Sequence, residues 1–143
     1  MLKIKLGGIL QYAKTVIVLD AIQSNTAQAA LPDSVNRAMS QASLCKQSQQ
    51  GPVYTSCMQD NSAQIRKDLI SLRDKKLQPF GYSKKQKIKQ NVDAEINKKL
   101  KLCLNEKARY QDLNQANKRH QYCIYENMVE ILLTLDRNIK LYQ

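Results

Sequence analysis

Apolar residues recur at steps of three and four through most of residues 34–142, a spacing that places them on one face of an α-helix. The pattern falls into four segments and predicts helices near residues 34–48, 53–77, 84–110 and 113–142. The recurring residues are Val35, Ala38, Ala42 and Cys45; Tyr54, Cys57, Asn61, Ile65, Leu69, Leu72 and Leu77; Ile88, Val92, Ile96, Leu100 and Cys103; and Ile124, Met128, Ile131, Leu135, Ile139 and Tyr142. Because the last two apolar faces are the longest, we expect them to form most of the core.

Residues that stop helices separate three of these segments. Gly51-Pro52 and Pro79-Phe80-Gly81 are expected breaks, since proline has no amide hydrogen to donate inside a helix. No glycine or proline separates the last two segments. A turn is nevertheless expected at Asp112, which can cap a new helix together with Gln115 three residues later.

Two further helix starts carry capping residues. Asp33 or Ser34 is placed to accept the free amide hydrogens of the first helix. Ser83, with Gln86 three residues later, has the capping-box pattern at the start of the third helix.

The first 29 residues have the outline of an export signal. Lys3, Lys5 and Lys14 form a basic start, an apolar stretch begins at Thr15, and residues 27–29 form a small-x-small cleavage site. Asp20 departs from this pattern, because a charge weakens insertion of so short a segment. Residues 1–29 are therefore predicted to be a signal peptide or an attached N-terminal targeting or docking segment, and residues 30–143 a single helical domain.

Four cysteines in a chain of 143 residues favour two disulfides in an oxidising compartment. Cys45 and Cys57 are symmetric about Gly51, and Cys103 and Cys123 are symmetric about Leu113, so each pair faces across a predicted turn. Local pairing is preferred to the nested pairing Cys45–Cys123 with Cys57–Cys103, which straight antiparallel helices would mismatch by roughly 12 Å. Zinc is disfavoured because the close cysteine pairs of common structural sites are missing.

The predicted fold class is accordingly all-α, a small bundle of about four helices arranged as two disulfide-stapled helical hairpins. The composition agrees, with no tryptophan, one phenylalanine, four glycines and three prolines. Asp60 with Asn61, and Glu126 with Asn127, follow the second cysteine of each hairpin, and we expect them to cap the hairpins and to form hydrogen bonds between helices.

Positive charge is concentrated in one part of the chain. Removing the three lysines and one aspartate of residues 1–29 from the formal charge of +11 leaves +9, and residues 66–109 carry all of that excess. Lys84, Lys87, Lys98, Lys101 and Arg109 fall on one face of the predicted third helix, with Asn91, Ala94 and Asn105 between them. This face is roughly 37 Å long and has no acidic residue on it. It is either a solvated surface that keeps the protein soluble or a docking face for an anionic partner.

The sequence offers little for catalysis. It has no glycine-rich phosphate loop, no paired carboxylates beside a base and no nucleophile with a partner. His120, the only histidine, is read as a surface helix residue. We therefore expect a protein that is not an enzyme and has no cofactor and no metal.

Two functions remain open. One is a secreted or periplasmic binding protein that uses the basic helix face to dock an acidic protein or an anionic envelope surface. The alternative is a structural or accessory subunit of a larger envelope or organelle assembly, for example in the mitochondrial intermembrane space, held by an uncleaved N-terminal helix. Nucleic acid is disfavoured as a partner, because no aromatic stacking residues lie among the lysines.

Overall fold

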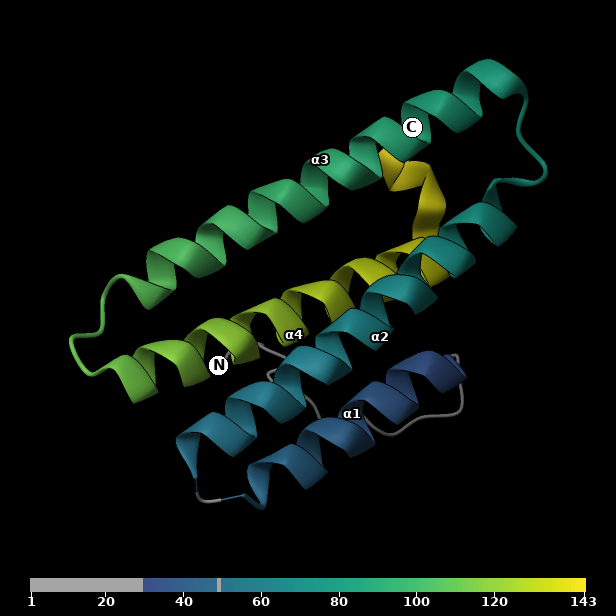
Figure 1. Ribbon diagram of the computed structural model, residues 1–143. Coiled ribbons are helices and arrows are strands. Elements are labelled where there is room, and N and C mark those ends of the chain that lie inside the picture. Colours follow the sequence, from purple (N-terminus) through teal and green to yellow (C-terminus); the bar gives the residue numbers. More distant parts are fainter. Residues whose placement is uncertain (1–29, 49) are drawn as a thin grey trace. The chain divides into compact units, whose positions relative to one another are not determined.

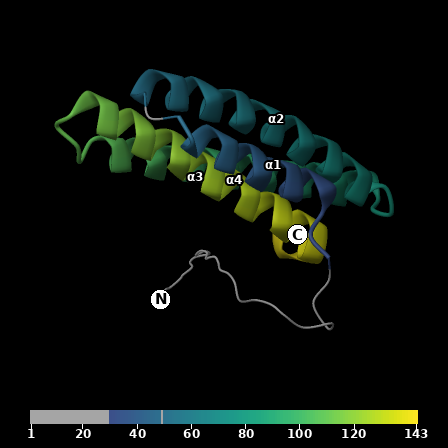
Figure 2. The same cartoon turned by 90° about the horizontal axis from the view of Figure 1, so that it is seen from below.

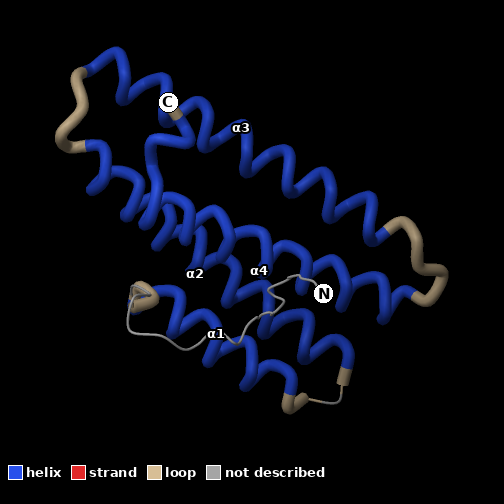
Figure 3. The backbone as a smooth tube through the Cα atoms, turned by 180° about the vertical axis from the view of Figure 1, so that it is seen from behind, coloured by secondary structure: helices blue, strands red, loops and turns tan. Residues whose placement is uncertain are grey.

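The computed structural model describes residues 30–48 and 50–143, of which residues 31–143 form one compact unit. This part of the chain is all-α, as predicted. It consists of α1 (Asp33–Lys46), α2 (Gly51–Leu77), α3 (Tyr82–Lys107) and α4 (Leu113–Asn138), followed by the 3₁₀ helix η2 (Ile139–Tyr142) (Figure 1). Short connecting loops are the only other structure in the described residues (Figure 3). The predicted N-terminal segment, residues 1–29, lies outside the described part.

Some of the predicted helix starts are confirmed. The side chain of Asp112 accepts a hydrogen bond from the backbone amide of Asn114 at 3.0 Å, so the turn between α3 and α4 lies where the sequence placed it. The α2 helix begins at Gly51 with Pro52 in its first turn.

The caps predicted for α1 and α3 were wrong. Pro32 and Gly81 occupy the positions before these helices, and neither helix has a capping hydrogen bond from a side chain. Asp33 and Ser83 consequently lie inside the first helical turn, where their side chains no longer replace the missing partner of a backbone amide.

The helices lie in the spatial order α1, α2, α4, α3. The most extensive packing joins α2 to α4, whereas α3 packs chiefly on α4 and α1 chiefly on α2 (Figures 1 and 2). The inner pair α2 and α4 is parallel: Gly51 lies beside Asn114 at one end, and Lys76 donates to the carbonyl of Asp136 at 2.9 Å near the other. This parallel contact was not predicted, because helices joined by short turns are expected to pack with their chain neighbours.

The larger core cluster draws on all four helices. Seven of its twelve fully buried residues belong to α3 and α4, in agreement with the prediction for those two helices, and the other five to α1 and α2. The twelve residues are Val35, Ala38, Ile65, Leu69, Leu77, Ile88, Val92, Ile96, Met128, Ile131, Leu132 and Leu135. A second, smaller cluster surrounds Cys45 and contains Ala42, Tyr54 and Met58 of α1 and α2, at the end that carries their turn. Tyr122 and Tyr125 of α4 pack against it.

Each hairpin is closed by one disulfide, as predicted. Cys45 is bonded to Cys57 and Cys103 to Cys123, with Cα–Cα distances of 5.6 Å and 5.5 Å. The nested pairing is thereby excluded. Asn61 donates to the carbonyl of Ala38 at 3.0 Å and joins α2 to α1, as expected.

Disulfides are typical of proteins that mature in an oxidising environment. Among the described helices, none is long and apolar enough to cross a membrane.

Candidate functional site

The basic face predicted on the third helix lies on the outer side of α3. The buried residues of this helix are Ile88, Val92, Ile96 and Cys103, on the side that packs against α4. At about 100° per residue, Lys87, Lys98 and Lys101 lie roughly opposite that buried side, whereas Lys84 and Arg109 lie toward its flanks. All five are exposed, and we refer to them as the basic stripe: Lys84, Lys87, Lys98, Lys101 and Arg109.

Four members of the basic stripe carry charges that no carboxylate neutralises locally. Lys84, Lys87, Lys98 and Lys101 form no ion pair with any other described residue. The neighbouring Lys99 differs, since it lies half-buried between Glu95 at 3.9 Å and Glu130 at 3.6 Å. The stripe therefore presents an uncompensated positive potential over most of its length.

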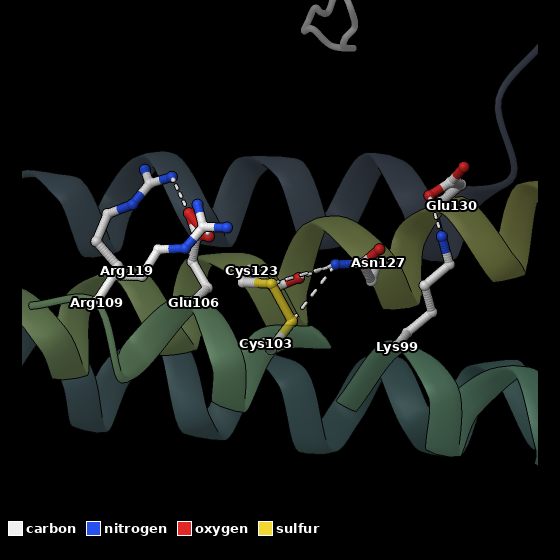
Figure 4. Close-up of a disulfide and its surroundings, with 8 residues drawn as sticks. All are labelled: Lys99, Cys103, Glu106, Arg109, Arg119, Cys123, Asn127 and Glu130. Carbon is white, nitrogen blue, oxygen red and sulfur yellow. Dashed lines mark hydrogen bonds and ion pairs between the residues drawn. A yellow bond between two sulfur atoms is a disulfide. The ribbon is translucent and has the colours of Figure 1, made fainter. Parts of the chain in front are cut away.

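Arg109, at the end of the stripe, differs from the four lysines because it forms an ion pair. Its guanidinium lies 3.4 Å from Glu106, whose other carboxylate oxygen lies 3.7 Å from Arg119 of α4 (Figure 4). The sequence predicts no acidic residue on this face, yet the side chain of Glu106 reaches Arg109 because residues three apart are neighbours on a helix. The free cationic surface consequently ends near Lys101.

The middle of the stripe touches the end of the chain. The side chain of Asn91 donates to the backbone carbonyl of Tyr142 at 2.7 Å, and η2 bends from the end of α4 toward α3 (Figure 1). Asn91 is therefore half-buried and is not available to a partner in the way the lysines are. Sequence reasoning missed this contact because it depends on where the last four residues turn.

The second half of the stripe also has an apolar component. Lys98 and Lys101 line a shallow, open depression with Leu102, Ala94, Asn97 and Asn105. Leu102 is 49% exposed, although leucine normally lies in the core. A partner that docks here would bury apolar surface between two cations.

The attachment of α3 to the bundle is concentrated on α4. Cys103 is fully buried and bonded to Cys123, and the amide of Asn127 donates toward both sulfur atoms at 3.4 Å (Figure 4). The same amide donates to the carbonyl of Cys123 at 2.8 Å, so Asn127 bonds within its own helix as well as at the disulfide. These contacts attach the inner side of α3 to α4 and leave its outer side exposed.

Other groups with possible chemistry give no organised site in the described residues. His120 is half-buried on α4, and burial and the nearby Lys107 lower its pKa below the usual value. No group of three or more histidine, cysteine, aspartate or glutamate side chains there is placed to hold a metal ion.

A second group of cations, which sequence reasoning missed, lies at the end of the bundle that carries the α1–α2 and α3–α4 turns. Lys46, Lys118 and Arg119 line a shallow pocket with Tyr54 and Tyr122. The hairpin pattern brings Lys46 close to α2, but only the packing of α4 on α2 adds the other cations. No local signal in the sequence predicts that packing.

Comparison with protein-family models, with curated proteins and with solved structures gave no match to this chain.

Proposed function

We propose that this chain is a binding protein without enzymatic activity, which docks an acidic protein on the outer side of α3. The observation that carries the proposal is the row of four lysines, Lys84 to Lys101, that are exposed and have no ion pair with another described residue. The row is roughly 26 Å long at helical rise, a length suited to an extended protein surface.

Two features favour a protein partner over other anionic surfaces. The exposed Leu102 beside Lys98 and Lys101 offers apolar contact of the kind found at the centre of protein interfaces. Aromatic residues do not alternate with the lysines, and such residues are what single-stranded nucleic acids stack on.

The repulsion between lysines on this helix is an argument that the row has a function. Lysines three and four residues apart repel one another and mildly destabilise a helix. On the outer side of this helix Lys84 with Lys87 and Lys98 with Lys101 are such pairs, and an acidic partner would offset their repulsion on binding.

The two disulfides support an oxidising location for this activity, and we propose a periplasmic or secreted protein. The alternative function, a structural subunit of an envelope or organelle assembly, places the binding determinant in residues 1–29 instead of α3. The two proposals therefore differ in which part of the chain carries the interaction.

The test compares two variants with the same change in net charge. The stripe variant replaces Lys84, Lys87, Lys98 and Lys101 by Gln, which is about as good a helix former as Lys. The control replaces four exposed basic residues elsewhere, Arg66, Lys67, Lys75 and Lys140, which also lack ion pairs with described residues. Arg109 is left unchanged because Glu106 already pairs with it.

Each protein is used as bait in its native extract at low and at physiological salt, and binding of the captured acidic partner is then measured with purified proteins. We expect the wild type and the control to bind it with an association rate that falls as salt rises, since charges are screened over about 8 Å at physiological ionic strength. The stripe variant should bind more slowly and with little dependence on salt. Equal association of all three proteins at both salt levels would contradict the proposal.

A further inference from the structure

The pocket at the turn end of the bundle collects three cations from two helices. Lys46 ends α1, and Lys118 and Arg119 lie in the second turn of α4. Ser48, in the α1–α2 turn, adds a hydroxyl group to the same lining, and this hydroxyl donates to the carbonyl of Gln50 at 3.5 Å. These groups converge on one open concavity although they are distant in the sequence.

The two lysines are held in place without being neutralised. The ammonium of Lys46 lies 5.0 Å from the ring centroid of Tyr122, and that of Lys118 lies 5.7 Å from the ring centroid of Tyr54. Neither ammonium forms an ion pair with another described residue. A cation over an aromatic face keeps its full charge and loses part of its freedom, so less entropy remains to be lost when an anion binds.

The two tyrosines suit this role chemically. Tyr54 is buried and Tyr122 half-buried, and burial raises the pKa of both phenols above the ordinary value. Glu126 raises them further, while Arg119 opposes the increase. Both rings therefore stay neutral near pH 7 and keep the electron-rich face that holds each ammonium.

We propose that this pocket binds a phosphate group, with Lys46 and Lys118 as charge partners and Arg119 as an additional donor. The charge decides between phosphate and carboxylate. A phosphate monoester carries about two negative charges at neutral pH, which matches the two lysines that lack an ion pair. Arg119 shares Glu106 at 3.7 Å and supplies a planar set of donors suited to phosphate oxygens.

The proposal does not depend on the function of the basic stripe, because its residues lie on α1, α4 and the turn between α1 and α2. In the test, the full chain is titrated with inorganic phosphate at constant ionic strength. Binding is monitored by the NMR chemical shifts of the backbone amides. The pocket variant combines Lys46→Gln and Lys118→Gln. The control combines Arg66→Gln and Lys67→Gln, two exposed residues of α2 outside the basic stripe, and changes the net charge equally.

We expect saturable shifts centred on Ser48, Lys118 and Arg119 in the wild type and in the control. The pocket variant should bind phosphate roughly tenfold more weakly or worse, as expected when hydrogen bonds to a charged group are lost. Acetate, with a single charge, should also bind roughly tenfold more weakly to the wild type. Shifts that do not saturate, equal affinity in the pocket variant, or equal affinity for acetate would each overturn the proposal.

The source of the phosphate is decided by a second arm with vesicles. Phosphatidylcholine vesicles with and without phosphatidic acid are sedimented with the wild type, the pocket variant and the control. Retention on phosphatidic acid that only the pocket variant loses identifies a lipid headgroup. No retention, together with saturable phosphate binding in solution, identifies a soluble phosphate ester.

Discussion

Removing the disulfide between Cys103 and Cys123 should weaken this protein by an amount that its loop length sets. This bond closes a loop of 20 residues and the bond between Cys45 and Cys57 closes one of 12. In the chain-entropy model these lengths correspond to about 3.3 and about 2.8 kcal/mol of the free energy of unfolding. Loop length alone therefore predicts nearly equal losses for the two bonds.

The packing, in contrast, predicts a difference between the two bonds. The α3 helix packs chiefly on α4 and η2, whereas α1 packs on α2 and also reaches α4. Without the bond from Cys103 to Cys123, α3 should open locally more often than α1 does without its own bond. The double variant Cys103→Ala and Cys123→Ala should then expose the amides of α3 to hydrogen exchange well before global unfolding.

Urea unfolding of both double alanine variants measures the loss of stability, and native-state hydrogen exchange measures the local opening. Alanine is preferred to serine because Cys103 is fully buried and a hydroxyl group there would have to find a partner. A loss below about 1 kcal/mol for the α3–α4 bond would refute the loop-entropy argument. Uniform protection along α3 in that variant would refute the argument from packing.

Three further predictions test other parts of the structure. Asp112→Ala should lower the free energy of unfolding in urea by about 1 kcal/mol, because it removes the hydrogen bond that caps the amide of Asn114. Asp33→Ala removes no capping bond and should cost less, so equal losses for the two variants would contradict the assigned caps. Sequencing the N-terminus of the native protein should give Ala30 as the first residue, as cleavage after Ala29 predicts, and an intact Met1 would favour the subunit function. The pKa values of Tyr54, Tyr122 and Tyr125 are raised in the folded protein, so their contribution to stability is complete below the ordinary pKa of 10.0, and the free energy of unfolding should fall as the pH rises beyond that value. Phenolate absorbance near pH 10 is compared in folded and urea-unfolded protein, and equal absorbance would contradict the raised pKa values.

Much of the fold was predictable from local patterns. The helix segments and the disulfide pairing follow from apolar spacing, from two proline breaks and from the symmetry of each cysteine pair about its turn. These are relations within a hairpin, and short-range geometry determines them. The caps of α1 and α3 failed because Pro32 and Gly81 start those helices earlier than the polar residues suggested.

Relations between hairpins were not predictable. The parallel contact of α2 with α4 joins residues about sixty apart, and no turn or cysteine specifies it. The same distinction between local and long-range relations applies to the two candidate sites. The basic stripe lies on one helix and was found from spacing alone, whereas the pocket around Lys46 and Lys118 requires α4 to lie beside α1 and α2 and was missed.

The position of α4 at the centre of the bundle gives a last prediction, on Leu132. The apolar stripe read from the sequence contained Ile131 and Leu135 but not Leu132, yet Leu132 is 0% exposed, because α4 has neighbours on more than one side. Leu132→Ala should therefore cost 2–5 kcal/mol, roughly the range for a leucine that leaves a cavity. Leu141→Ala is the matched control, since Leu141 is 69% exposed and the same change should cost well under about 1 kcal/mol. Urea unfolding measures both, and the slope with denaturant should stay that of the wild type if the described helices unfold together. A loss for Leu132→Ala no larger than that for Leu141→Ala would show that α4 does not connect the helices on its two sides.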